Sequence, residues 1–100
     1  MLIGVGKIVL DFYNNDDAPL KNSKLEKLCK EVRRKFNVSI LEIADFDDPE
    51  RCVIGFAAVI PDNWKMQSSQ SFVRKICDTI DESAFARVMV EDCDFLTHGE

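Results

Sequence analysis

The segment that most constrains how this chain can fold runs from Phe36 to Val59, FNVSILEIADFDDPERCVIGFAAV. It holds two short apolar runs, Asn37–Phe46 and Arg51–Ile60, each of the length expected for a buried strand. Between them, Asp47-Asp48-Pro49 is a strong chain breaker. The segment therefore predicts two consecutive strands joined by an acidic turn.

A helix is predicted on each side of this pair of strands. The first begins either with the capping box Ser23-x-x-Glu26 or one turn earlier, at Asp17-Ala18-Pro19. The second follows Pro61 and can be capped by Asp62 or Asn63. The apolar stripes at helical spacing are Leu25, Leu28, Cys29, Val32 and Phe36 in the first helix, and Phe72, Val73, Ile76, Cys77 and Ile80 in the second.

Two further strands are predicted near the ends of the chain. Leu2–Tyr13 is apolar on both alternating faces, which favours a central strand, and its Gly4 and Gly6 indicate a bulge or a close backbone approach. Ser83–Leu96 alternates more clearly between apolar and polar residues. A change of apolar parity between Ile40 and Leu41 indicates a bulge or burial on both faces.

The resulting order, β-α-β-β-α-β, predicts an α+β, ferredoxin-like fold with a four-stranded antiparallel sheet and two helices on one face. The right-handed crossover rule places the first and third strands at the centre. Because the helices can cover only one face, the apolar residues of the third strand that point the other way need a second cover. A homodimer is the leading candidate, with Val53, Ala57 and Val59 in its interface.

Length and composition predict one domain, spanning residues 1–96, with a frayed tail at 97–100. The N-terminus lacks the charged and small-residue parts of a signal peptide, and no apolar run approaches the roughly 20 residues that cross a bilayer. We therefore expect a cytoplasmic protein with no membrane partner. The four widely spaced cysteines and the single His98 do not fit a zinc site, and buried reduced thiols are favoured over disulfides.

The first helix carries seven of the thirteen basic residues of the chain. The segment 21–35 has a net charge of +5, in a chain whose net charge is −5. Such a face could contact the phosphates of RNA, and the alternative is a solvated helix with Glu26–Lys30 and Glu31–Lys35 pairs. The candidate nucleic-acid-binding residues are Lys24, Lys27, Lys30, Arg33 and Arg34.

Other candidate sites are weaker. The acidic residues between Glu42 and Glu50 could hold Mg²⁺ or Ca²⁺, but they lack the spacing of an EF-hand, so a solvated turn is favoured and no metal is expected. Phe56 is better explained as a core residue than as a base-stacking platform, and Trp64 as a packing or interface anchor. No catalytic residues are identified, because His98 has no nucleophile at a recognisable spacing.

Several short motifs resemble those of a known family. They are Ile3-Gly4-Val5, Leu20-Lys21 leading into a basic helix, Arg33-Arg34-Lys35-Phe36-Asn37-Val38-Ser39, Glu42-x-x-Asp45-x-Asp47, Arg51-x-x-Ile54-Gly55-x-Ala57-x-Val59 and Lys75-Ile76-Cys77-Asp78-x-Ile80-Asp81. With them the chain resembles the YlxP-like family of small bacterial proteins (domain of unknown function 503). The resemblance implies a ferredoxin-like fold and no assigned activity. The genes of that family are often found near genes of translation initiation and ribosome maturation, which implies a role connected with RNA or the ribosome.

The sequence therefore predicts a non-catalytic accessory protein without a cofactor, which binds RNA or the ribosome, but not DNA, through its basic first helix. The alternative is a dimeric regulatory or protein-interaction module that uses the open face of the sheet. The two differ in salt dependence, because phosphate contacts weaken steeply with added salt whereas an apolar interface does not.

Overall fold

The computed structural model describes residues 1–83 and 86–99 of the chain. Within them, four strands and two helices follow one another in the predicted order. They are β1 (Leu2–Asp11), α1 (Ala18–Lys35), β2 (Ser39–Ala44), β3 (Arg51–Ile60), α2 (Met66–Glu82) and β4 (Arg87–Thr97).

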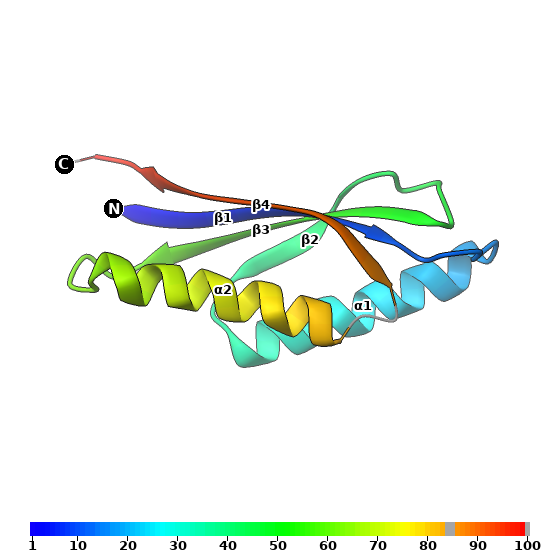
Figure 1. Cartoon of the computed structure of the whole chain (residues 1–100), viewed down its shortest axis with the longest axis horizontal. Helices are drawn as coiled ribbons and strands as arrows, with labels where there is room; N and C mark the ends of the chain where they lie inside the picture. Colours follow the sequence, from blue (N-terminus) through cyan, green and yellow to red (C-terminus); the bar gives the residue numbers. More distant parts are fainter. Residues whose placement is uncertain (84–85, 100) are drawn as a thin grey trace.

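The strands form one antiparallel sheet in the order β2-β3-β1-β4. Both helices lie on the same face of this sheet, and the other face is left uncovered in Figure 1. The ferredoxin-like α+β arrangement is thereby confirmed, and so is the central placement of the first and third strands. No helix in the described part of the chain is long and apolar enough to span a membrane.

The two helices begin in different ways. Asp17 caps α1 by accepting a hydrogen bond at 3.2 Å from the Leu20 backbone amide, with Pro19 in the first turn. Of the two predicted starts, the earlier one is therefore correct. The second helix begins later than expected, at Met66, with Lys65 at the cap position and no side-chain cap. The prediction that Asp62 or Asn63 caps it is wrong, because the chain first turns between Pro61 and Trp64, where the Trp64 amide donates to the Pro61 carbonyl.

The core lies between the helices and the even-numbered side chains of β1 and β3. Ile8, Leu10 and Ile54 are fully buried there and pack with the apolar stripes of both helices. The predicted close approach in β1 occurs at Gly6, where an added Cβ would collide with the Phe56 ring. Glycine is needed at this position because the aromatic ring of the adjacent strand fills the space that a side chain would occupy.

The edge strands depart from expectation in detail. The pairing is regular at Ile40 and Leu41, where a bulge or burial on both faces was expected, and the bulge of β2 lies further on, between Glu42 and Ala44. A second bulge separates the pairing of Val9 and Leu10 with β4. The last strand was expected to start at Ser83, but α2 runs to Glu82 and β4 begins at Arg87. Residues 84 and 85 of that predicted strand, and residue 100 of the predicted tail, lie outside the described residues.

The strand β4 continues through Thr97, the first residue of the predicted tail. Beyond it, the backbones of Met1 and His98 exchange two hydrogen bonds of 2.8 Å. The pairing between β1 and β4 therefore extends as far as Met1 and His98.

Candidate functional site

The uncovered side of the sheet, called the open face below, carries the odd-numbered residues of the two central strands. Their even-numbered neighbours point into the core, and side chains alternate along a strand. Residues opposite one another in the register point to the same side, which places parts of β2 and β4 on this face too. Its apolar members are Ile3, Val5, Val9, Leu41, Ile43, Val53, Ala57, Val59, Val90 and Leu96.

The open face is strongly apolar and exposed to solvent. The exposed fraction is 66% for Val59, 53% for Leu41 and 50% for Leu96, and these come from three different strands. Contiguous apolar surface of this kind is uncommon on monomers and usually marks an interaction site. The open face is therefore the most prominent candidate surface in the described part of the chain.

The three residues predicted for a dimer interface are all on the open face but differ in accessibility. Ala57 and Val59 are exposed, whereas Val53 is only 6% exposed because its own chain surrounds it. Its register neighbours are Val9 and Ala44, and the bulge in β2 brings Ile43 over the adjoining Gly55. A partner would therefore contact Val59 and Ala57 and reach little of Val53.

Charged side chains of both signs interrupt the apolar surface on the β1–β4 side. Lys7 on β1 lies directly opposite Asp92 of β4, and Asp94 is opposite Val5. All three charged residues are exposed. The open face thus combines an apolar area over β2 and β3 with charges of both signs over β1 and β4, where Asp11 and Arg87 form a further opposite pair at the far end of the ladder.

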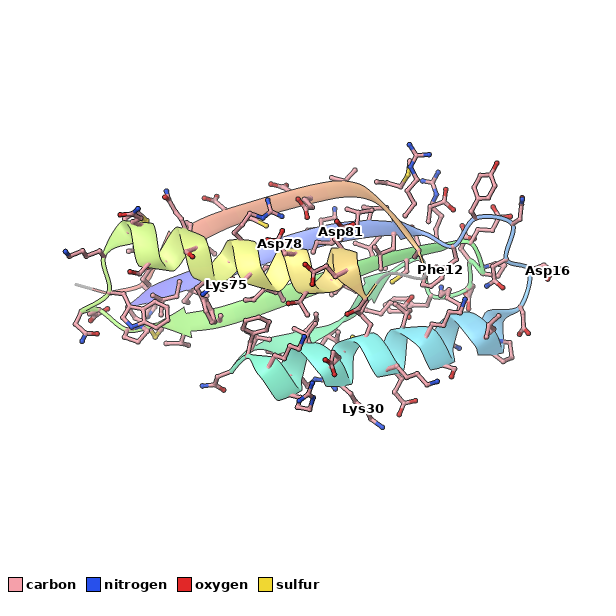
Figure 2. All side chains as sticks on the ribbon, turned by 60° about the horizontal axis from the view of Figure 1, so that its bottom comes forward. Phe12, Asp16, Lys30, Lys75, Asp78 and Asp81 are labelled. Carbon is pink, nitrogen blue, oxygen red and sulfur yellow. The ribbon has the colours of Figure 1, made fainter. Side chains whose placement is uncertain are left out.

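The predicted nucleic-acid-binding residues all lie on α1, and several have acidic partners on the same helix. Lys30 pairs with Glu26 at 3.1 Å, and Arg34 pairs with Glu31 at 2.8 Å. These pairs are solvent-exposed, and Figure 2 shows Lys30 pointing away from the sheet. The Arg34 guanidinium lowers the pKa of the Glu31 carboxyl through a hydrogen bond.

The other three members of this set differ in their surroundings. The guanidinium of Arg33 donates a hydrogen bond at 2.8 Å to the Ile40 carbonyl, which ties α1 to β2. Lys24 is half-buried near the start of the helix, whereas Lys27 is exposed. The helix therefore brings the predicted residues onto one element, with part of their charge neutralised by Glu26 and Glu31.

The first basic residue of the helix, Lys21, is fully buried, and its burial was not predicted from the sequence. Its ammonium donates to the backbone carbonyls of Asp48, Asp45 and Arg51 at 2.6, 2.8 and 2.9 Å, and the Phe46 carbonyl lies further away, at 3.4 Å. The sequence did contain a signal, since Lys21 is four residues before Leu25 and so continues the apolar stripe of α1 toward its start. This position favours a lysine whose ammonium points inward.

Glu42 is the acidic residue next to this ammonium. Its Oε2 lies 3.2 Å from Lys21 Nζ, yet it accepts no hydrogen bond among the described residues. The two observations agree, because the three ammonium protons are directed at the three close carbonyls. The attraction between Lys21 and Glu42 is therefore a charge interaction without a directed hydrogen bond.

The acidic turn thus encloses a lysine ammonium. Asp45 adopts a left-handed backbone conformation (φ 62°), and its carbonyl is one of the three closest that accept from Lys21. Among residues 1–83 and 86–99, no three potential metal ligands of the His, Cys, Asp and Glu types come together. The cation at this turn belongs to the chain itself.

The aromatic residues and cysteines fill mostly structural positions. Phe56 is buried in the core. Trp64 packs edge-to-face on Phe72 with ring centroids 5.5 Å apart, as a packing anchor would. All four cysteines are free thiols, and three of them are buried, while Cys93 is exposed in contrast to its predicted core position.

Comparison with known proteins gives a family and a fold. The family profile described as "Protein of unknown function (DUF503)" matches residues 3–92. A candidate chlorite dismutase of known structure aligns with 95% of this chain at 7% identity and a TM-score of 0.50. The chain covers 44% of that protein, which is less than half of its length.

Two smaller proteins of known structure align with the whole chain. A candidate antibiotic biosynthesis monooxygenase from Deinococcus radiodurans has 16% identity over 100% of this chain and 94% of its own, with a TM-score of 0.48. A de novo designed protein with a ferredoxin fold has 15% identity over 100% and 87%, with a TM-score of 0.46. No match was found among curated proteins. At such low identities these likenesses concern the fold alone.

Proposed function

This chain belongs to the family described as "Protein of unknown function (DUF503)", and we propose that it is a non-catalytic interaction module that forms a homodimer through the open face of its sheet. The observation that carries the proposal is the exposed apolar surface of Leu41, Val59 and Leu96 on three strands. Removal of this surface from water stabilises an assembly by about 25 cal/mol per Å² of apolar area.

The total surface of the chain also supports a partner. Its accessible area is 6343 Å², whereas a compact monomer of 11.4 kDa exposes about 5,800 Å². Part of the excess reflects an elongated shape, with extents of 47 × 22 × 20 Å. A single sheet with helices on one side leaves the other side to be covered by a second body.

A second copy of the chain fits this surface because the open face carries charges of both signs. In a two-fold interface the same patch meets itself, so that a residue on one copy contacts a different residue on the other. Lys7 of each copy can then approach Asp92 or Asp94 of the partner copy while the apolar areas pack together. An interface with carboxylates alone would repel its own copy, and the presence of Lys7 removes that obstacle.

Light scattering coupled to size exclusion tests the proposal. We expect wild-type protein to have the mass of a dimer and Val59→Lys to have the mass of a monomer, because the new ammonium would be buried without a partner. Tyr13→Lys is a matched control, since Tyr13 is 76% exposed in the loop after β1 and is not on the open face. A monomeric wild-type protein at about 100 μM, a concentration at which even micromolar dimers persist, would refute the dimer.

A second candidate function, binding of RNA or the ribosome, is favoured by the gathering of basic residues on α1. The side chains of Lys30 and Arg34 are both 68% exposed despite their ion pairs. Exposed ion pairs of this kind contribute little to stability, so the two cations can readily leave their carboxylate partners and contact phosphates instead. Binding through this helix would weaken steeply with added salt.

Sedimentation of cell lysate through sucrose gradients at low and high salt tests this candidate. We expect co-migration with a ribosomal subunit at low salt, release at high salt, and loss of binding in the double variant Lys27→Glu/Arg34→Glu. Lys65→Glu/Lys75→Glu, which makes the same charge change at two exposed lysines, one just before α2 and one within it, is the control. Binding that survives the first double variant would show that α1 is not the contact surface.

A further inference from the structure

Two cysteine thiols, one on α2 and one on β4, lie close enough to react with each other. Cys77 is on the buried side of α2, and Cys93 on the edge strand β4 is exposed. Their sulfur atoms are 3.4 Å apart. A disulfide requires a sulfur–sulfur separation of about 2.0 Å, so a relative movement of about 1.4 Å brings the two atoms to bonding distance.

The elements that carry these thiols are held together by a neighbouring ion pair. Arg74 lies one helical turn before Cys77 and donates two hydrogen bonds, of 2.9 and 3.0 Å, to the Glu91 carboxylate. Glu91 and Cys93 are two residues apart on β4 and therefore point to the same side of the sheet, toward α2. The approach of the two sulfur atoms thus follows from the packing of α2 on β4.

We propose that Cys77 and Cys93 are a redox modification site that a low-molecular-weight disulfide, such as oxidised glutathione, converts to an intramolecular disulfide. The Cys93 thiolate attacks one sulfur of the glutathione disulfide, whose S–S bond breaks and releases one glutathione thiolate. The sulfur of Cys77 then attacks Cys93 Sγ and displaces the second glutathione sulfur, which takes up the proton that the Cys77 thiol loses. Both leaving thiolates are protonated, so two protein thiols are oxidised while one disulfide is reduced to two thiols.

Exposure and protonation divide the roles of the two residues. Cys93 is accessible to a soluble oxidant, whereas Cys77 is enclosed. Burial, followed by the hydrogen bond and charge of Cys93, raises the pKa of Cys77 to about 12, which keeps it a thiol near neutral pH. After Cys93 becomes a mixed disulfide, its charge no longer opposes ionisation of Cys77, and the second step benefits from the high effective concentration of neighbouring groups.

This site is separate from the surfaces proposed above. Cys93 lies opposite Gly6 in the register, and Gly6 is one of the even-numbered residues of β1 that point toward the helices. Disulfide formation therefore leaves the open face and α1 unchanged. A failure of the redox proposal would not affect the dimer, and a failure of the dimer would not affect the redox site.

The experiment is incubation of the reduced wild-type protein with oxidised glutathione, followed by alkylation, intact mass measurement and peptide mapping. We expect a loss of about 2 Da and a linked pair of peptides that contain Cys77 and Cys93, with full reversal by dithiothreitol. A stable glutathione adduct on Cys93, a bond between Cys93 residues of two molecules, or no reaction would overturn the proposal.

Two variants separate the steps. Cys77→Ala should retain the glutathione adduct on Cys93, because the resolving thiol is gone. Cys93→Ser changes an exposed residue, should fold normally and should give neither adduct nor disulfide. Cys29→Ala is the matched control, since it removes another buried thiol and should still form the Cys77–Cys93 bond. Oxidation of Cys77 in the Cys93→Ser protein would contradict the assigned order of attack.

Discussion

Replacement of Lys21 by methionine should destabilise this protein severely, although the change keeps most of the side-chain volume. In the native protein the ammonium satisfies three backbone carbonyls of the turn between β2 and β3 and lies 3.2 Å from the Glu42 carboxylate. Methionine has no donor, so these carbonyls lose their partner and the Glu42 charge loses its neighbour. Removal of one partner from a buried ionic contact typically costs about 3–5 kcal/mol.

That cost is large compared with the stability of a domain of this size. A small domain has a free energy of unfolding of about 5–15 kcal/mol, so Lys21→Met would remove a third or more of it in a typical case. The double variant Lys21→Met/Glu42→Gln should recover at least about 1 kcal/mol, because the uncompensated carboxylate is then absent. The control is Lys27→Met, which removes an exposed ammonium two turns further along the same helix and should change stability by less than about 0.5 kcal/mol.

Urea denaturation at pH 7, followed by circular dichroism, measures all four proteins. The free energy of unfolding in water is obtained by linear extrapolation for wild type and each variant. A loss below about 1 kcal/mol for Lys21→Met, similar to that of the control, would refute the structural role of the buried ammonium. Equal stability of the single and double variants would refute the coupling between Lys21 and Glu42.

Three further predictions concern packing, capping and thiol reactivity. Gly6→Ala should lower the free energy of unfolding by about 2 kcal/mol or more, because its Cβ collides with the Phe56 ring. The double variant Gly6→Ala/Phe56→Leu should lose less stability than Gly6→Ala alone. Equal stability of Gly6→Ala and wild type in urea would contradict this prediction. Asp17→Ala removes the cap of α1 and should cost about 0.5–2 kcal/mol by the same assay, whereas Asp16→Ala should cost little. Iodoacetamide at pH 8 should alkylate the exposed Cys93 quickly and Cys52 only after denaturation, because Cys52 is buried and burial raises its pKa to about 12. Peptide mapping locates the alkylated residues. Rapid labelling of Cys52 in the native protein would disagree with its burial.

The fold could be predicted from the sequence because the spacing of the apolar residues, the positions of the chain breakers and the crossover rule all indicate the same arrangement. The apolar stripes of both helices and the runs of β1 and β3 fix which surfaces must be buried, and the crossover rule then leaves one sheet order. The open face followed from the same argument, since β3 has more apolar residues than one layer of helices can cover. These inferences depend on periodicity, which does not change when individual side chains repack.

The surroundings of single residues could not be predicted in the same way. Lys21 was grouped with the basic residues of α1 because composition counts charge without regard to direction, and its burial depends on where the β2–β3 turn places three carbonyls. The burial of Val53 depends on the bulge in β2, and the approach of Cys77 and Cys93 depends on how α2 docks on β4. Each of these contacts joins segments far apart in sequence.

The pairing of Met1 with His98 determines how this molecule responds to mechanical force. The strands β1 and β4 are antiparallel neighbours, so residues 1 and 98 lie side by side at one end of their ladder. A load applied between these residues pulls along the direction of the interstrand hydrogen bonds and breaks them one pair at a time. The sheet would therefore open like a zipper at low force, whereas a load applied to opposite ends of β1 and β4 would strain the whole ladder at once.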